Sequence, residues 1–220
     1  AEHLIVATTD KVYGSDSPVD GFREKDPLKG TEPYSHSKVV ADILSANYPL
    51  PKGKQISIVR AGNVVGGGDH NPDRLIPEVV FKSNDLIRLR QPFSRRPWQH
   101  VLDVSRAYDL ISERKGEWTE VYNIGPAETI GLTALEVSEI GMDILKGEGG
   151  LEFSQDLNSL NETHDLRLNS EKIKSELSWS PKLSQQQSVA LAFHWHAAVN
   201  KGQAAQGVSR DQISSYLSKE

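Results

Sequence analysis

Apolar and polar positions along this chain follow two periods, one typical of buried strands and one typical of helices. Residues 2–9 and 55–65 each form an apolar run that ends in polar residues, which predicts two buried strands. Between them, apolar residues recur at spacings of three and four over 35–47 and predict an amphipathic helix, which Pro49 and Pro51 end. Strands separated by helices in this way favour an α/β fold with parallel strand pairing.

The later part of the chain continues the alternation with shorter elements. Thr133 and Glu136 have the spacing of a capping box, so a helix is expected to begin there. The further predicted helices cover 73–82, 104–113, 170–177 and 185–199, and the further predicted strands cover 86–90, 120–124, 151–153 and 165–169. After Lys201 the sequence is polar, and we expect a loose tail over 201–220.

The start of the chain and a change near Asp69 suggest its organisation. The first residue is not methionine, and a predicted core strand follows at once, so we expect this chain to be preceded by the amino-terminal part of a longer protein. Around Asp69 the pattern of residues changes from that of buried strands to that of mixed polar segments. We therefore predict a sheet domain over 1–68 and, over 69–200, a smaller lobe interspersed with elements that return to the sheet.

Composition narrows the classes of function. The formal net charge of −5 argues against a nucleic-acid-binding surface, since phosphate binding needs a basic face. No apolar run approaches the roughly 18 residues that cross a bilayer, and no signal peptide opens the chain, so no membrane partner is expected. The absence of cysteine excludes a disulfide framework and a thiolate metal site. These features favour a cytoplasmic protein without a metal centre.

Two clusters of residues could carry chemistry. Thr9, Asp10 and Lys11 end the first predicted strand, and ligands of open parallel sheets bind beyond the carboxyl ends of strands. Tyr34 and Lys38 lie four residues apart at the start of a predicted helix, which puts both side chains on one face. There an ammonium can favour the phenolate form of tyrosine, which then serves as a base. Either cluster alone is also compatible with an ordinary strand end or a surface helix.

The order of motifs resembles the extended short-chain dehydrogenase/reductase family. The series covers most of the chain and reads Thr9-Asp10-Lys11, Tyr34-Ser35-His36-Ser37-Lys38, Arg60-Ala61-Gly62-Asn63, Asp73-Arg74-Leu75-Ile76-Pro77, Arg96-Pro97-Trp98-Gln99-His100, Tyr122-Asn123-Ile124-Gly125 and Leu177-Ser178-Trp179-Ser180-Pro181. Within the family it looks most like CDP-glucose 4,6-dehydratases. The resemblance implies the carboxyl-terminal part of a Rossmann-type doubly wound sheet with a smaller mixed α/β substrate lobe, and a role in making deoxysugars, including those of lipopolysaccharide O-antigen.

The resemblance also implies an activity and a cofactor. The substrate would be a nucleoside-diphosphate glucose, which loses water to give a 4-keto-6-deoxy sugar, with NAD as a hydride carrier that is regenerated in each turnover. Tyr34 would take the proton of the sugar 4-hydroxyl, Thr9 would hydrogen-bond that oxygen, and Lys38 would hold the cofactor's ribose. Asp10 would protonate the departing 6-hydroxyl. Thr8, Tyr34 and Lys38 are the expected cofactor-binding residues.

One residue departs from the better-known dTDP-glucose branch of the family. That branch has glutamate, the presumed base for the sugar C5 proton, where this chain has Lys11. Lysine at this place resembles the CDP-glucose branch, but it leaves the identity of the C5 base open. The expected substrate-binding residues, also assigned by resemblance, are Asn63, Arg74, Leu75, Arg96 and His164.

Alternatives remain open at the level of sequence. The chain could belong to another NAD-dependent dehydratase or 4-epimerase acting on a dTDP- or UDP-sugar, or be a non-catalytic remnant of one. A 4-epimerase would need no acid such as Asp10. No Gly-x-x-Gly-x-x-Gly sequence is present, so we expect residues 1–68 to form a partial NAD-binding domain and this chain alone to be inactive. When complete, the protein is expected to be a homodimer.

Overall fold

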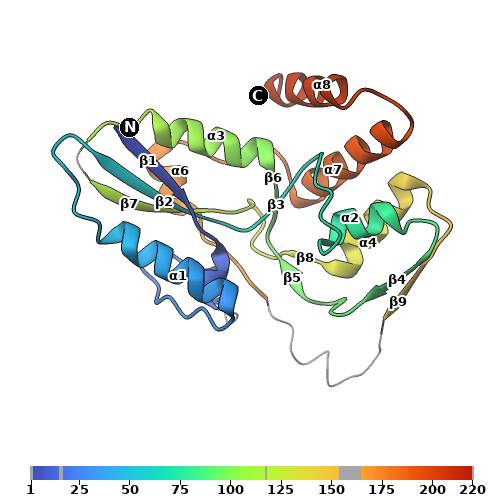
Figure 1. Ribbon diagram of the computed structural model, residues 1–220, viewed down its shortest axis with the longest axis horizontal. Coiled ribbons are helices and arrows are strands. Elements are labelled where there is room, and N and C mark those ends of the chain that lie inside the picture. The colour runs from blue at the N-terminus through green and yellow to red at the C-terminus, as the bar shows by residue number, and fades with distance from the viewer. Residues whose placement is uncertain (1, 15–16, 117, 154–164, 220) are drawn as a thin grey trace.

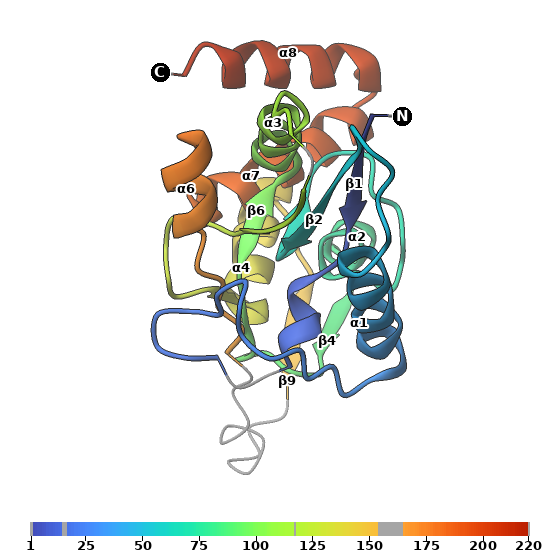
Figure 2. The same ribbon diagram turned by 90° about the vertical axis from the view of Figure 1, so that its left-hand side faces the viewer.

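A three-stranded parallel sheet with helices on both faces forms one half of the molecule (Figures 1 and 2). The structure is a computed structural model that describes residues 2–14, 17–116, 118–153 and 165–219. The strands, in spatial order, are β1 (His3–Ala7), β2 (Gln55–Ala61) and β7 (Thr119–Ile124). Every residue of the central strand β2 is buried, as expected for a strand paired on both edges and covered on both faces.

The covering helices come from distant parts of the sequence. Helix α1 (Pro33–Ala46) lies on one face of the sheet, and α3 (Val101–Ser112) and α6 (Glu171–Leu177) lie on the other (Figure 1). The core between the sheet and these last two helices joins Val59 of β2 to Ile111 of α3 and Ile173 of α6. This arrangement, a parallel sheet between helical layers, confirms the predicted Rossmann-type α/β class.

The other half of the molecule is built from short strand pairs and three helices. The strand pairs are β3 (Asn63–Val65) with β6 (Trp98–His100), β4 (Leu86–Leu89) with β9 (Gly150–Phe153), and β5 (Arg95–Arg96) with β8 (Leu132–Thr133), of which only the last is antiparallel. Helices α2 (Leu75–Phe81), α4 (Ala134–Leu145) and α7 (Gln185–Asn200) share a second core around Val79, Val137 and Phe193. Gly141 on α4 makes this packing possible, since a Cβ there would lie 2.4 Å from the Phe193 ring.

One local prediction is confirmed and another is corrected. The capping box of α4 is present: the Thr133 Oγ1 accepts from the Glu136 N–H at 3.1 Å, and the Glu136 carboxylate accepts from the Thr133 N–H at 2.7 Å. The predicted strand over 55–65 is interrupted at Gly62, where β2 ends and the chain crosses to β3 in the other half. Gly62 fits this crossing because a Cβ there would lie 2.7 Å from Pro97.

The expectation of a loose tail is wrong. Residues Ala205–Leu217 form a further helix, α8, which lies along α7 and above α3 (Figures 1 and 2). Tyr216 anchors it, because its ring is buried and its hydroxyl donates to the buried Asp103 at 2.6 Å. A second correction concerns 165–169, where Leu168 makes an isolated bridge to Phe22 instead of a strand. Across the described residues, no helix combines the length and the apolar character needed to span a bilayer.

Candidate active site

A short 3-10 helix, η1 (Asp10–Tyr13), follows β1 and holds a buried acid. Asp10 is 3% exposed, and its Oδ1 accepts a hydrogen bond from the Thr9 hydroxyl at 3.0 Å. Its Oδ2 has no hydrogen-bond partner among the described residues. Burial raises the pKa of Asp10 to about 6, and the Thr9 hydrogen bond and the charge of Arg96 oppose this only in part. Asp10 therefore keeps its proton up to about pH 6, well above the range of an ordinary aspartate.

The Thr9 hydroxyl uses its proton in a hydrogen bond to Asp10. It donates its one proton to Asp10 and accepts from the Lys11 N–H at 3.3 Å, so it caps η1 at the same time. In this arrangement Thr9 can accept a hydrogen bond from a ligand hydroxyl but cannot donate one. Thr9 orients Asp10, a contact that sequence reasoning did not foresee.

Helix α1 presents Tyr34 and Lys38 on one face beside the end of β1. The helix begins with Pro33, and the Ser35 hydroxyl fixes the preceding turn by accepting from the Glu32 N–H at 2.9 Å. Tyr34 is 52% exposed, and the Lys38 Nζ lies 3.5 Å from the carbonyl oxygen of Ala7. Both side chains therefore remain able to bind a ligand.

A buried ion pair holds α1 against the sheet beneath this face. Arg60 on β2 binds Asp42 on α1 through two bonds, Nε to Oδ2 at 2.8 Å and Nη2 to Oδ1 at 2.6 Å. The same guanidinium donates to the Tyr13 hydroxyl, which donates to Asn123 on β7 at 2.7 Å. Thr8 joins this network, since its hydroxyl donates to Asp42 at 3.2 Å. These contacts fix the position of Tyr34 and Lys38 relative to Asp10.

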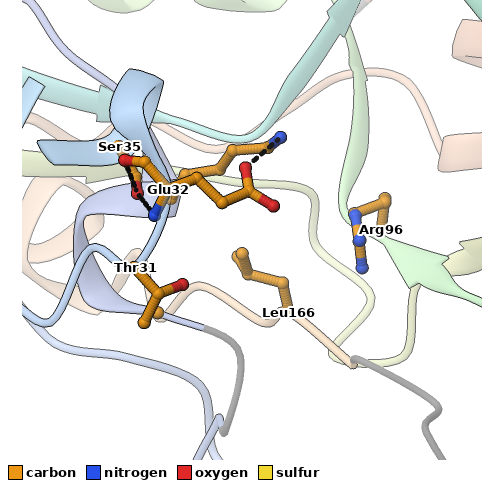
Figure 3. Close-up of a pocket in the computed structure, with 7 residues that line it drawn as sticks. Thr31, Glu32, Ser35, Arg96 and Leu166 are labelled. Carbon is orange, nitrogen blue, oxygen red and sulfur yellow. Dashed lines mark hydrogen bonds and ion pairs between the residues drawn. The ribbon is translucent and has the colours of Figure 1, made fainter. Parts of the chain in front are cut away.

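A cavity of about 120 Å³ opens between η1, the start of α1 and β5. It is lined by Lys11, Gly14, Thr31, Glu32, Ser35, Arg96 and Leu166. Figure 3 shows the Glu32 carboxylate directed into this space, with Arg96 on the opposite side. The Lys11 Nζ lies 3.9 Å from the Glu32 Oε2 and 5.8 Å from the centre of the Tyr34 ring, which ties the two chemical clusters of the sequence to one place.

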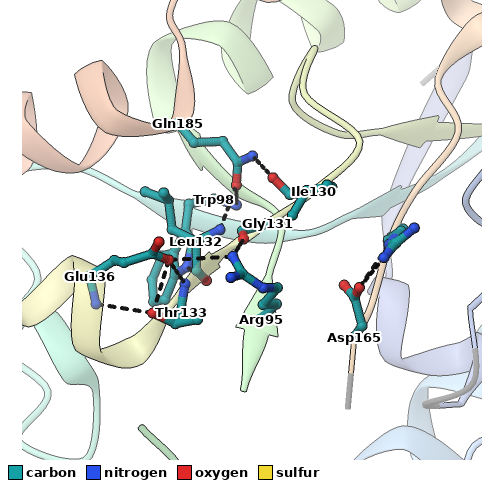
Figure 4. Close-up of polar contacts among 10 residues, drawn as sticks. Arg95, Trp98, Ile130, Gly131, Leu132, Thr133, Glu136, Asp165 and Gln185 are labelled. Atoms are coloured by element: carbon teal, nitrogen blue, oxygen red, sulfur yellow. Dashed lines mark hydrogen bonds and ion pairs between the residues drawn. The ribbon is translucent and has the colours of Figure 1, made fainter. Parts of the chain in front are cut away.

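A polar network in the other half holds the strand that carries Arg96 (Figure 4). The Gln185 side chain accepts from the Trp98 N–H at 3.0 Å and donates to the Ile130 carbonyl at 2.8 Å. The Trp98 indole N–H donates to the Leu132 carbonyl at 3.1 Å. Because β5 and β6 are tied in this way to β8 and α7, Arg96 is held at the cavity by the second core.

Arg96 also lines a second, larger cavity of about 350 Å³. Its other lining residues include Leu75 and Trp98, the guanidinium groups of Arg88 and Arg90, and the carboxylates of Asp73 and Glu78. Arg88 is paired with Glu152, Nε to Oε2, at 2.6 Å. The two cavities share Arg96, and a ligand with a central anionic group could contact both.

The predicted substrate-binding residues are distributed unevenly around this site. Arg96 and Leu75 line a cavity, and the Asn63 N–H donates to the Pro97 carbonyl at 2.9 Å, directly beside Arg96. Arg74 is exposed, lies 3.8 Å from Asp69 and does not line either cavity. His164 lies outside the described residues.

Sequence reasoning missed Glu32. Its position immediately before Pro33-Tyr34 was the available signal, because a residue at the N-cap of α1 must lie close to the tyrosine. No group of three His, Cys, Asp or Glu residues in the described part of the chain is arranged to hold a metal ion.

Comparison with known families shows to which family the chain belongs. The family model described as GDP-mannose 4,6 dehydratase matches residues 1–191. The chain belongs to this family. Among curated members, the CDP-glucose 4,6-dehydratase of Salmonella typhimurium is 34% identical over 98% of this chain, and the dTDP-glucose 4,6-dehydratase of Streptomyces griseus is 28% identical over 88%. The chain spans 64% and 58% of the lengths of these two relatives.

Solved structures of family members have the same fold. The dTDP-glucose 4,6-dehydratase of Bacillus anthracis in complex with NAD superposes with a TM-score of 0.74 at 28% identity, covering 94% of this chain and 64% of that one. The dTDP-glucose 4,6-dehydratase of Streptomyces venezuelae, with NAD and TYD bound, has a TM-score of 0.75 at 28% identity, covering 91% of this chain and 61% of that one. The predicted fold and family are thus confirmed.

Proposed function

We propose that the protein containing this chain removes water from a nucleoside-diphosphate glucose and forms the 4-keto-6-deoxy sugar nucleotide. The observation that supports this most is Asp10, a buried carboxyl with a pKa of about 6 that is poised to give a proton to a departing hydroxyl. A 4-epimerase needs no such acid. The matching relatives from Salmonella typhimurium and Streptomyces griseus are named as 4,6-dehydratases, which agrees with this assignment.

The residues of α1 fit the nicotinamide end of NAD. The Lys38 ammonium has three donors, and its contact with the Ala7 carbonyl, at 3.5 Å, is a long one, so donors remain for ribose hydroxyls. Tyr34 is half exposed on the same face. The Thr8 hydroxyl donates to Asp42, so Thr8 would contact the cofactor through its backbone, at the end of β1. When bound, NAD would supply a reversible hydride acceptor for the sugar.

The chain's own residues would divide the proton transfers between them. Tyr34 takes the proton of the sugar 4-hydroxyl as that carbon is oxidised, and Lys38 lies on the same face of α1. Thr9 accepts a hydrogen bond from the sugar and keeps Asp10 oriented. Asp10 then protonates the 6-hydroxyl as it leaves as water.

The two cavities that share Arg96 support a nucleotide-sugar substrate. The cavity that Lys11 and Glu32 line would take the glucose, and the Arg96 guanidinium would bind the diphosphate through paired N–H groups. The larger cavity, with Leu75 and Trp98 in its wall, would take the nucleoside. Asn63, beside Arg96, would contact the diphosphate, and Arg74 and His164 keep the substrate-binding roles that the resemblance implies.

The proposed substrate is CDP-glucose, and a competition assay among three sugar nucleotides tests this choice. The protein expressed from its complete gene is incubated with CDP-, UDP- and dTDP-glucose at equal concentration, and the 4-keto products are separated and measured. Preference for CDP-glucose by about 10- to 1000-fold is expected if one hydrogen bond to the base is mispaired in the others. Preference for dTDP-glucose would move the protein to that branch, and turnover of none would refute the dehydratase assignment.

We also propose a homodimer formed through α1. Val40, Ile43 and Leu44 are exposed on this helix, and Tyr48 continues the apolar face just beyond it. A contiguous apolar face of this kind marks an interaction surface.

A further inference from the structure

Elimination of water from the 4-keto sugar requires a base for the C5 proton. Lys11 stands where the dTDP-glucose branch has its presumed base, but the structure places it in an ion pair with Glu32. An ammonium in an ion pair has no lone pair with which to take a proton. We propose that Glu32 is the base that accepts the C5 proton and that Lys11 positions its carboxylate. This inference rests on the proposed dehydratase function.

The position of Glu32 supports this role. It is the N-cap residue of α1, two residues before Tyr34, and its carboxylate points into the cavity that Lys11 and Arg96 line (Figure 3). Its backbone is held at both polar groups, because the Ser35 hydroxyl accepts from the Glu32 N–H and donates to the Glu32 carbonyl, each at 2.9 Å. Gly30 permits this close turn, since a Cβ there would lie 2.9 Å from the backbone of Ser35.

The two carboxyl groups of this site lie in opposite environments. Asp10 is buried, which favours its protonated form, whereas the Glu32 side chain is 65% exposed and faces the cations of Lys11 and Arg96. A pair of carboxyl groups separated in this way provides an acid and a base at the same pH. In the dTDP-glucose branch, a glutamate at the position of Lys11 follows the aspartate directly. Here the second carboxylate comes from the helix instead.

The elimination step balances within the sugar and these two residues. The C5–H bond breaks and its proton goes to the Glu32 carboxylate, while its electron pair forms the C5=C6 double bond. The C6–O bond breaks, and the hydroxyl leaves with the proton of Asp10 as water. Neither oxidant nor reductant is consumed in this step, and the protonated Glu32 is then available to return a proton to C5.

Two variants made in the protein expressed from its complete gene test the assignment, Glu32→Gln and Lys11→Met. Glutamine keeps the size of the side chain and leaves the backbone contacts with Ser35 in place, and circular dichroism checks the fold. Turnover of CDP-glucose is measured in D2O, with C5 deuterium in the product and the absorbance of reduced nicotinamide as further readouts. A residue that only shapes the site would lower the rate without blocking C5 exchange.

Glu32→Gln is expected to lower turnover by about 10²- to 10⁴-fold, to accumulate reduced nicotinamide, and to leave protium at C5 of the bound 4-ketone. Lys11→Met is expected to cost less than about tenfold, the size of a partly exposed ion pair, and to retain C5 exchange. The reverse pattern would make Lys11 the base and overturn the inference while the dehydratase function stands. Absence of turnover in the unaltered protein would overturn both.

Discussion

Replacing the buried acid with its amide should make the protein more stable and less active at once. Asp10→Asn removes a carboxyl whose pKa burial raises from 3.8 to about 6. That difference of about 2 pKa units corresponds to about 3 kcal/mol by which the ionised form destabilises the fold at pH 7. The Asn Oδ1 can keep the Thr9 hydrogen bond, but its amide N–H would replace an oxygen that has no partner, which costs about 1 kcal/mol. The net expectation is a gain of about 2 kcal/mol.

The pH dependence of this gain identifies its cause. Between about pH 4 and pH 6 the unfolded chain releases the Asp10 proton while the folded chain keeps it, so the folded form binds more protons and stability falls as pH rises. Above about pH 6 the folded parent carries the full destabilisation caused by ionised Asp10. Below about pH 4 Asp10 is protonated in both states, and this destabilisation is absent. Asp10→Asn should therefore exceed the parent by about 4–8 °C in Tm at pH 7, and most of that margin should disappear at pH 4.

Thermal unfolding followed by circular dichroism at both pH values provides the measurement. In the protein expressed from its complete gene, Asp10→Asn should also stall after oxidation of C4, and the reduced-nicotinamide absorbance should remain high. A variant that is less stable than the parent at both pH values would refute the argument from burial. A stabilised variant with parental turnover would refute the role of Asp10 as the acid.

Three further predictions concern α1 and its contacts. Tyr34→Phe should lower turnover by about 10²- to 10⁴-fold without changing the urea midpoint, because the hydroxyl serves as a base and the ring is half exposed; equal loss of stability would point to a structural role. Asp42→Asn should cost about 3–5 kcal/mol in urea unfolding, because it leaves the buried Arg60 charge without its partner, and a loss below about 1 kcal/mol would contradict this. Leu44→Glu should convert the proposed dimer to monomer in light scattering, whereas a dimer that persists would exclude this face.

Local patterns predicted most of the elements near the site because they depend on neighbours in sequence. The helix that carries Tyr34 and Lys38, the strand that ends at Thr9, and the capping box of Thr133 all follow from side-chain period and capping chemistry, which act over a few residues. The tail was mispredicted for the complementary reason. Helix α8 has a weakly apolar sequence, and its one deeply buried side chain, Tyr216, is fixed by Asp103 from a distant helix.

The sequence by itself determined the family, the fold class and the types of residue that could carry the chemistry. These follow from the order of motifs along the chain, which can be read without knowing where the motifs lie in space. Only the tertiary structure decided which of those residues meet. It buried Asp10 and so changed its acidity, placed Arg96 between two cavities, and left Arg74 at the surface. It also brought Glu32 against Lys11 from another element. Burial and through-space charge depend on the packing of segments far apart in sequence, and spacing along the chain does not encode them.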